Sequence, residues 1–317
     1  MKQKVLLIGG MGFIGRYLVR ACCEACMTVR VADIVLPKAG TEESGVEYLQ
    51  GDYRDEAFLH TIIDGVNMVI HLAHDTILLD LNSNIEPEIE RNVLPAVRLM
   101  DACCASGIAK LVFVSSGGTL YGNYEPRVPI CEDAPKRPVS VYGISKLMIE
   151  QLGFLYYEQK NLPFIAARPG NAYGRGQLPF RGQGFVATAL ASALQCRTLN
   201  IFGDGSVVRD YVHVQDIAEA LVAMLNLGRI GEAYNIGTGH GTSLRTLVND
   251  CIVPIISDEG YKLNCNYASE RRADVIYNVL ANDKLREDTG FIPRIALREG
   301  MLSTWQWMKK YNCCGEK

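Results

Sequence analysis

Two residues near the middle of the chain have the types and the spacing for proton chemistry: Tyr142 and Lys146. Residues four positions apart share one face of a helix, where an ammonium group can hold a phenol partly ionised. Such a phenolate is a base that can take a proton from an alcohol. Most Tyr-xxx-Lys pairs are packed rings and solvated lysines on ordinary helices, so the rest of the sequence must decide whether this pair is catalytic.

A glycine-rich turn close to the N-terminus supplies that context. The apolar run 5–8 is followed by Gly9, Gly12 and Gly15, and an amphipathic stretch extends from 16 to 26. The apolar run predicts a buried parallel strand, and the glycines let backbone N–H groups approach a pyrophosphate at the N-terminus of the next helix. This order of strand, glycines and helix is typical of a dinucleotide-binding turn.

The second predicted strand indicates which dinucleotide would bind. It covers residues 28–32 and ends in Asp33. An acidic side chain at this strand end accepts hydrogen bonds from the adenosine ribose and repels a 2′-phosphate, so the sequence favours NAD over NADP. The alternative is a structural glycine turn followed by an aspartate that caps a helix.

A regular alternation of strands and helices must position these residues. Further apolar runs predict strands at 46–49, 67–73, 110–115 and 163–167, with long helices at 88–106 and 141–160. Such alternation predicts an α/β fold with a doubly wound, Rossmann-like parallel sheet.

The second part of the chain has a different character. After residues 168–171 the sequence becomes glycine-rich and irregular, which indicates a smaller, mixed α/β C-terminal substrate lobe. We expect a NAD-binding domain at 1–170, completed by 208–240, and a substrate lobe formed by 171–207 and 241–317.

Composition limits the kind of protein. The 317 residues are 48% hydrophobic and carry a net charge of −3, without a polybasic run. Neither nucleic acid nor an anionic membrane surface is therefore an expected partner. No apolar stretch is long enough for membrane insertion, and the apolar run before Gly9 is too short for a signal peptide. We expect a cytoplasmic protein.

The cysteines raise the question of a metal site. The chain has 11 of them, an odd number, and no paired CxxC arrangement. This pattern argues against zinc and against a disulfide framework. We interpret the cysteines as small hydrophobic residues and expect no metal.

Together these motifs resemble the extended short-chain dehydrogenase/reductase family that acts on nucleotide sugars, most closely the UDP-glucose 4-epimerase group. The resemblance runs almost from end to end. It is also carried by the segments 51–55, 71–73, 114–122, 168–174, 202–205, 209–214 and 234–237 and by Asn92.

The resemblance implies NAD as cofactor, a nucleotide-sugar substrate, a homodimer, and roles for particular residues. The implied cofactor-binding residues are Gly9, Gly12, Phe13, Ile14, Gly15, Asp33, Asp52, Tyr53, Leu72, Ala73, His74, Asn92, Ser115, Tyr142, Lys146 and Pro169. The implied substrate-binding residues are Ser116, Thr119, Asn171, Phe202, Arg209, Arg271 and Asp274.

Several of these roles have a physical reason and an ordinary alternative. Arg209 and Arg271 can each fork onto two diphosphate oxygens, although either could be plain surface charge. Asp274 would hold the nucleotide ribose, and Asn171 would donate to a phosphate. Phe202 would stack near the pyrimidine, unless it belongs to the core.

The chain departs from the family at one catalytic position. The usual partner of the tyrosine is a serine or threonine hydroxyl 25 residues earlier, where this chain has Gly117. If the segment is extended, Thr119 points to the same side as residue 117 would. We therefore expect Thr119 to supply the hydroxyl, with Ser116 as the alternative if the glycines reshape the loop.

The implied reaction is 4-epimerisation of a nucleotide sugar. Tyr142 removes the proton of the 4-hydroxyl, Lys146 tunes that tyrosine, and Thr119 binds the 4-oxygen of a transient 4-keto sugar. A dehydratase is disfavoured because Gly118 and Thr119 occupy the places of the acidic pair of those relatives. A 4-keto nucleotide-sugar reductase and a catalytically silent NAD-binding sensor or scaffold remain alternatives, and the sequence does not specify the sugar or the nucleotide.

Overall fold

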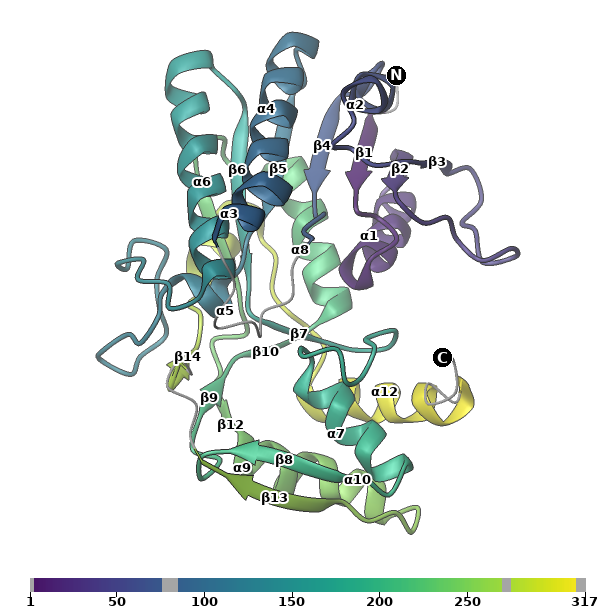
Figure 1. Cartoon of the computed structure of the whole chain (residues 1–317), viewed down its shortest axis with the longest axis vertical. Helices are drawn as coiled ribbons and strands as arrows, with labels where there is room; N and C mark the ends of the chain where they lie inside the picture. Colours follow the sequence, from purple (N-terminus) through teal and green to yellow (C-terminus); the bar gives the residue numbers. More distant parts are fainter. Residues whose placement is uncertain (1–2, 76–84, 270–274, 312–317) are drawn as a thin grey trace.

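The computed structural model describes residues 3–75, 85–269 and 275–311. It has a larger upper part built around a parallel sheet and a smaller lower part of short strands and helices (Figure 1). The chain passes between the two parts several times, so neither part is formed by one continuous segment.

A seven-stranded sheet, parallel throughout, forms the centre of the upper part. The apolar runs form its strands because both faces of a parallel sheet are covered, and every residue of the middle strand, β4 (Met68–His71), is buried. In spatial order the strands are β11 (Ala233–Ile236), β6 (Phe164–Pro169), β5 (Lys110–Val114), β4 (Met68–His71), β1 (Lys4–Ile8), β2 (Thr28–Asp33) and β3 (Glu47–Gln50).

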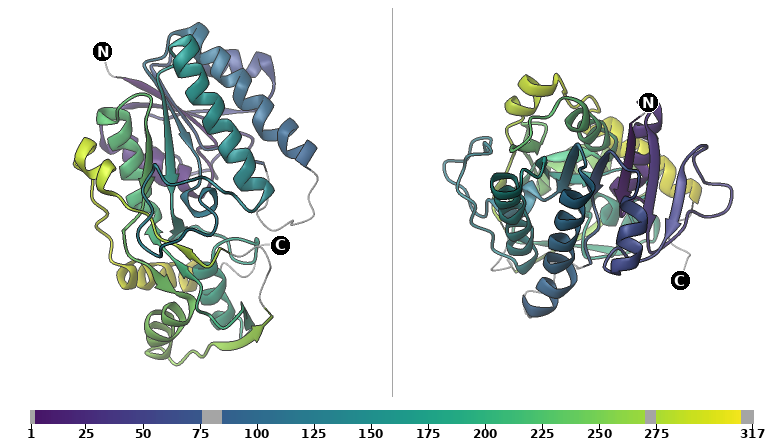
Figure 2. Two further views of the ribbon diagram at one scale, coloured as in Figure 1. Left: turned by 90° about the vertical axis from the view of Figure 1, so that its left-hand side faces the viewer. Right: turned by 90° about the horizontal axis from the view of Figure 1, so that it is seen from above.

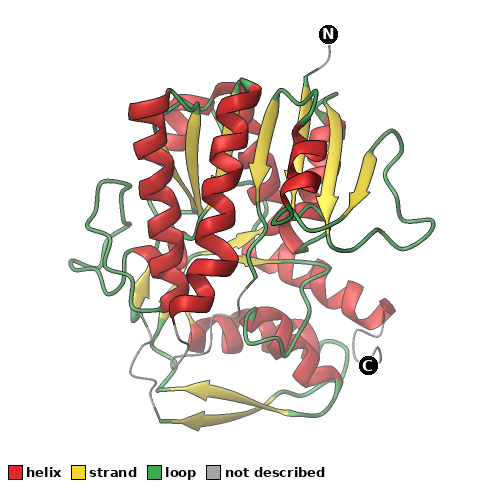
Figure 3. Ribbon diagram, turned by 45° about the horizontal axis from the view of Figure 1, so that its top comes forward, coloured by secondary structure: helices red, strands yellow, loops and turns green. Residues whose placement is uncertain are grey.

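Helices cover both faces of this sheet (Figures 2 and 3). On one face α1 (Phe13–Glu24) packs beside α8 (Val214–Leu227). The other face is covered by α2 (Glu56–Ile63), α4 (Leu94–Ser106) and α6 (Val141–Lys160). The long helix predicted at 88–106 is composite, since α3 (Ile85–Glu88), the π-helix η1 (Ile89–Val93) and α4 follow one another.

The lower part has its own apolar core, in which Leu190, Ile201 and Trp305 are wholly buried. The helices around this core are α7 (Phe185–Leu194), α9 (Leu244–Thr246), η2 (Leu247–Ile252), α10 (Val253–Ser257) and α12 (Leu297–Tyr311). Its strands are the parallel pair β8 (Thr198–Phe202) and β13 (Asn264–Ala268).

Short strands and one helix connect the two parts. The parallel pair β7 (Asn171–Tyr173) and β10 (Tyr211–His213) lies beneath the sheet, next to β9 (Val208–Arg209), β12 (Thr242–Ser243) and β14 (Tyr277–Asn278). Helix α11 (Asp283–Thr289) returns to the upper part, where Leu285 joins the core beside α1 and α8. The domain limits expected from the sequence stay a prediction. Helix α11 belongs to the segment 241–317, which we expected in the substrate lobe, but it packs against the upper part.

The strand order reverses between β1 and β4, and the glycine turn follows β1 at that point. Crevices at such switch points are where open α/β sheets bind ligands. Gly9 has a φ of +83°, and a Cβ there would lie 2.7 Å from the Ala73 backbone nitrogen. A Cβ on Gly15 would lie 2.6 Å from the Gly10 Cα, so neither position has room for a side chain.

The predicted fold class is confirmed. The strands expected at 5–8, 28–32, 46–49, 67–73, 110–115 and 163–167 are present as β1 to β6 with small shifts of their limits, and the helix predicted at 141–160 has those limits. Nowhere in the three described ranges does a helix combine the length and apolar character needed to span a membrane.

Candidate active site

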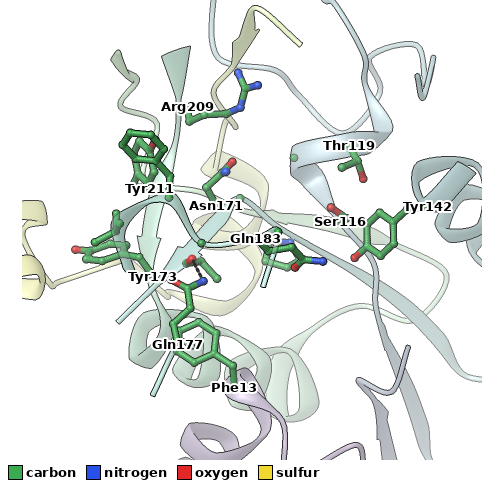
Figure 4. A pocket seen from close by; sticks show the side chains of 18 of the residues that line it. Phe13, Ser116, Thr119, Tyr142, Asn171, Tyr173, Gln177, Gln183, Arg209 and Tyr211 are labelled. Carbon is green, nitrogen blue, oxygen red and sulfur yellow. Dashed lines mark hydrogen bonds between the residues drawn. The ribbon is translucent and has the colours of Figure 1, made fainter. Parts of the chain in front are cut away.

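A cleft of about 1270 Å³ lies between the upper and lower parts, at the carboxyl ends of the sheet strands. Its upper wall comes from the glycine turn, the loop after β5 and the start of α6. Its lower wall comes from β7, β8, β9 and α7 (Figure 4). Residues that are distant in sequence therefore meet in one site.

Helix α6 positions the two residues with which the sequence argument began. Ser140 caps the helix, because its Oγ accepts a hydrogen bond from the Gly143 nitrogen at 3.1 Å. A Cβ on Gly143 would lie 3.0 Å from the Thr119 carbonyl oxygen, so the first turn packs closely on the loop after β5. Tyr142 and Lys146 both point into the cleft from this helix.

Tyr142 is protonated in this environment. Burial raises the pKa of its phenol to about 12, and a hydrogen bond with Ser116 partly opposes that rise. Figure 4 shows the Ser116 side chain beside the Tyr142 ring. Burial thus opposes ionisation of this phenol, and the partly ionised state expected from the sequence beside an oxidised nicotinamide stays a prediction.

Lys146 is buried beneath the cleft and is only 2% exposed. Its Nζ donates to the Val114 carbonyl oxygen at 2.9 Å and lies 5.6 Å from the centre of the Tyr142 ring. Burial lowers the pKa of this ammonium to about 7, while the carboxylates of Glu88 and Glu150 oppose the change. The lysine can thus gain or lose a proton near neutral pH.

The conformation of the loop after β5 explains why residue 117 is a glycine and which hydroxyl contacts Tyr142 instead. Residues 117–120 form the helical turn α5 (Gly117–Leu120), so the extended segment assumed in the sequence argument for Thr119 is wrong. A Cβ on Gly117 would lie 2.4 Å from Leu280 Cδ1 and 2.8 Å from the Arg168 carbonyl oxygen. Only glycine fits there, and Ser116 is the residue whose hydroxyl meets Tyr142.

Thr119 remains in the site despite this correction. It lines the cleft, and its Oγ1 is buried without a hydrogen-bond partner among the described residues. A buried hydroxyl of this kind is available to a bound molecule. Its catalytic role stays a prediction.

The glycine turn and Asp33 fit a dinucleotide. Asp33 Oδ2 accepts a hydrogen bond from the Met11 nitrogen at 2.9 Å, and its Oδ1 accepts from the Val35 nitrogen at 3.2 Å. The carboxylate is thereby fixed beside the turn, where it can meet a ribose. Gly9, Gly12 and Gly15 line the cleft and leave their backbone accessible to phosphates.

Two other predicted cofactor residues are engaged with the protein itself. Asp52 accepts hydrogen bonds from the Arg54 guanidinium, which hold the pKa of that carboxyl below its ordinary value. Asn92 is buried, and its Oδ1 accepts from the Asp75 nitrogen at 2.8 Å. Asn92 therefore holds the segment that follows β4, and its contact with the cofactor stays a prediction.

Most of the residues predicted for the site lie together in it. Those that line the cleft are Gly9, Gly12, Phe13, Ile14, Gly15, Leu72, His74, Ser115, Ser116, Thr119, Tyr142, Lys146, Pro169, Asn171, Phe202 and Arg209. Among the described residues, those that do not line it are Asp33, Asp52, Tyr53, Ala73 and Asn92. Arg271 and Asp274 lie outside the described residues.

Sequence reasoning missed several residues in the lower wall. Gln177, Gln183 and Tyr211 line the cleft, and Gln177 Nε2 donates to the Ala172 carbonyl oxygen at 3.0 Å (Figure 4). The two glutamines come from the irregular stretch between β7 and α7, which has no periodic signal. The only hint was the density of glycine in that stretch.

A buried ion pair supports the site from behind. The Arg168 guanidinium forms a two-pronged contact with Glu150 on α6, with a shortest distance of 2.7 Å. The same guanidinium donates to the Tyr121 hydroxyl at 3.0 Å, just after α5. The guanidinium of Arg168 thereby connects strand β6, helix α6 and the loop after β5 (residues 115–121, the catalytic loop).

Comparisons with known proteins agree with this geometry. The model of the NAD dependent epimerase/dehydratase family matches residues 5–237. The UDP-glucose 4-epimerase of Mycolicibacterium smegmatis is 31% identical over 97% of this chain and 99% of its own length.

Two solved structures extend the likeness to three dimensions. The UDP-glucose 4-epimerase of Thermotoga maritima, solved with UDP-glucose, is 29% identical with a TM-score of 0.90 and covers 98% of this chain and 100% of its own. The UDP-glucose 4-epimerase of Thermus thermophilus, solved with NAD, is 30% identical with a TM-score of 0.85 and covers 97% of this chain and 99% of its own.

Proposed function

The chain belongs to the NAD-dependent epimerase/dehydratase family, and we propose that it interconverts the 4-epimers of a UDP-hexose or UDP-N-acetylhexosamine while NAD stays bound. The observation that carries this proposal is the meeting of Tyr142, Lys146 and Ser116 in one cleft with the glycine turn. In this proposal Tyr142 is the base, the Lys146 ammonium lowers the pKa of that base, Ser116 supplies a hydroxyl, and the glycine turn binds the dinucleotide.

The residues that would hold NAD are those of the glycine turn, Asp33 and Lys146. The turn has no room for side chains at Gly9 and Gly15, and the Asp33 carboxylate is fixed beside it. When bound, NAD supplies an acceptor for the hydride from the sugar C4 and returns it to the opposite face. Its positive charge would favour the ionised form of a phenol beside it, here that of Tyr142.

The chain's own part in the reaction is to move one proton. Tyr142 accepts the proton of the sugar 4-hydroxyl and returns it to the same oxygen after the sugar has turned. Ser116 donates a hydrogen bond to the 4-oxygen while it carries carbonyl character, and the unpartnered Thr119 Oγ1 is a second donor. No net proton is consumed, which suits a closed isomerisation cycle.

The lower wall holds the nucleotide end so that the sugar can turn. Arg209 and Asn171 line the cleft on the side away from Tyr142 (Figure 4). A guanidinium and an amide suit the diphosphate. Arg271 and Asp274 are proposed as further nucleotide ligands from the resemblance alone.

Incubation of the purified protein with UDP-glucose and with UDP-galactose, each without added cofactor, tests this function. We expect interconversion in both directions and one tightly held NAD per chain. Turnover only of a 4-keto sugar with consumption of NADPH would establish the reductase instead. Bound NAD without turnover of any nucleotide sugar would establish a silent binder.

A homodimer and a cytoplasmic location belong to the same proposal. Family resemblance supports the dimer, and light scattering of the purified chain measures it. A mass near 35 kDa, that of one chain, would contradict the dimer.

A further inference from the structure

A buried carboxylate lies beside the catalytic pair, and the reaction as described leaves it without a task. Glu88, at the end of α3, is 4% exposed. Its Oε1 accepts a hydrogen bond from Ser145 Oγ at 2.5 Å and lies 2.9 Å from His74 Nε2. Ser145 is in α6 next to Lys146, so the carboxylate sits against the helix that carries the catalytic residues.

The His74 imidazole separates this carboxylate from the tyrosine. The His74 and Tyr142 rings meet edge to face, with their centres 4.8 Å apart. Burial, followed by the charge of Lys146, lowers the pKa of His74 to about 4, so the ring is neutral at neutral pH. The imidazole therefore contacts both the Glu88 carboxylate and the Tyr142 ring.

We propose that Glu88 is a positioning residue that sets the protonation of both Tyr142 and Lys146, and thereby the pH range of catalysis. This inference rests on the proposed function, because it assigns a purpose to the same pair. The carboxylate acts as a buried counter-charge that keeps the Lys146 ammonium protonated, at the cost of making the Tyr142 phenol harder to ionise.

The direction of each effect follows from charge. A nearby anion favours a cation and disfavours a second anion, and Glu88 raises the pKa of both Lys146 and Tyr142. Glu150 acts on Lys146 in the same direction, but the Arg168 guanidinium pairs with it directly. Glu88 lies against Ser145, the neighbour of Lys146 in α6, and against His74, whose ring contacts Tyr142, so its charge lies close to both members of the pair.

Other charged or titratable groups face this pair from the packed elements. His71 is buried at the end of β4, and Asp75 follows His74 and pairs with Arg54. Within the described residues, the groups that act on the pair or on His74 are His71, His74, Asp75, Glu88 and Glu150. The test must therefore change Glu88 while these others stay in place.

The test compares Glu88→Gln with wild-type holoenzyme through the pH dependence of kcat/KM. Turnover needs Tyr142 ionised and Lys146 protonated, so it follows a bell-shaped curve. Loss of the carboxylate lowers the pKa of both groups, so we expect both limbs to move to lower pH. The exposed Glu90→Gln, on the adjoining π-helix, is the matched control and should leave both limbs in place.

If kcat/KM of Glu88→Gln is lower at every pH but both limbs stay at the wild-type pH, the inference is overturned, because a purely structural role affects only the amplitude. A pH profile identical to that of the wild type would overturn it as well. Glu88→Asp keeps the charge but withdraws it by one methylene group, and an intermediate shift is expected. Should the glutamine variant fail to fold, Glu88→Met, which removes the charge and keeps the length of the side chain, takes its place, and unmoved limbs in that variant would overturn the inference.

A second readout separates this inference from the proposed function. The ultraviolet absorbance of the phenolate, taken as the difference between each protein and its Tyr142→Phe derivative, reports ionisation of Tyr142 in NAD-loaded protein without any sugar. We expect Glu88→Gln to ionise at lower pH than wild type. This shift would stand even if UDP-hexoses were not substrates, and its absence would leave the epimerase proposal intact.

Discussion

At the scale of single residues, Tyr142 is the proposed base of the reaction. Tyr142→Phe removes the hydroxyl but keeps the ring that packs against His74. We expect a fall in kcat of about 10³-fold or more, with NAD still bound, because the base is lost without emptying the pocket. Turnover of UDP-glucose and the absorbance of bound NAD measure the two effects. Wild-type turnover in this variant would remove the proposed mechanism.

The two hydroxyl groups of the catalytic loop allow a sharper comparison. Ser116 contacts Tyr142, whereas Thr119 Oγ1 has no partner within the described residues. We expect Ser116→Ala to lower kcat by about 10²-fold, the usual effect of losing one positioned donor. The expected effect of Thr119→Val is smaller, because α5 turns that side chain away from the position assumed for an extended loop.

Steady-state kinetics of both variants decide between the two hydroxyls. The KM for the nucleotide sugar should change little in either, since neither residue lies at the diphosphate end of the cleft. A larger loss in Thr119→Val than in Ser116→Ala would restore the order expected from the sequence.

At the scale of elements, the catalytic loop is shaped by packing rather than by its own sequence. Gly117→Ser would restore the hydroxyl that the family resemblance leads one to expect. A Cβ there clashes with Leu280 and with the Arg168 carbonyl oxygen, so we expect a loss of stability of about 2 kcal/mol and lower, not higher, activity. Urea denaturation and kcat check this outcome, and an active, fully stable Gly117→Ser enzyme would contradict it.

The same loop shows what sequence reasoning could and could not reach. Strands and helix α6 were predictable, because apolar runs, a serine cap and glycine punctuation are local signals. The turn α5 was not, since two glycines and a threonine are poor helix formers. Its geometry depends on the Asn278 Nδ2 group, which donates to the Gly117 carbonyl oxygen at 3.0 Å from 161 residues away.

Some residues of the candidate site could likewise be predicted from the sequence, and others could not. Residues at strand ends, such as Asp33 and Ser115, follow from the parallel sheet. Glu88 did not stand out, because a glutamate in a helix ordinarily faces water, and only the folded chain brings it against Ser145. Gln177 and Gln183 lie in irregular backbone, where neighbours in space cannot be read from periodicity.

At the scale of the whole molecule, buried histidines should make stability depend on pH. Burial lowers the pKa of His71 to about 3 and that of His74 to about 4. In the unfolded chain these histidines take up protons below about pH 6.5, whereas in the folded chain they stay neutral until the pH is much lower. The free energy of unfolding is therefore unaffected by them above about pH 6.5 and decreases as the pH falls below that value. We expect each histidine to destabilise the fold by about 2 kcal/mol at pH 5.

The dependence of Tm on pH measures this effect. Among the described residues, His213 has a pKa lowered by burial in the same way, so His71→Leu removes one of three such histidines and should flatten the fall in Tm between pH 7 and pH 5. The exposed His60→Gln is the control and should keep the wild-type slope. An unaltered slope in His71→Leu would mean that the buried ring is not responsible.

Helix α12, the last element described, supplies Met301, Trp305 and Met308 to a core whose other residues come from segments that begin as early as Tyr173 and end before α12. The lower part therefore stays open while the ribosome is still adding residues, whereas the first six strands of the sheet are complete by Pro169. During synthesis the glycine turn can form well before the nucleotide end of the cleft closes. A nascent chain could then recruit its dinucleotide first, with the sugar pocket assembled around an already loaded enzyme.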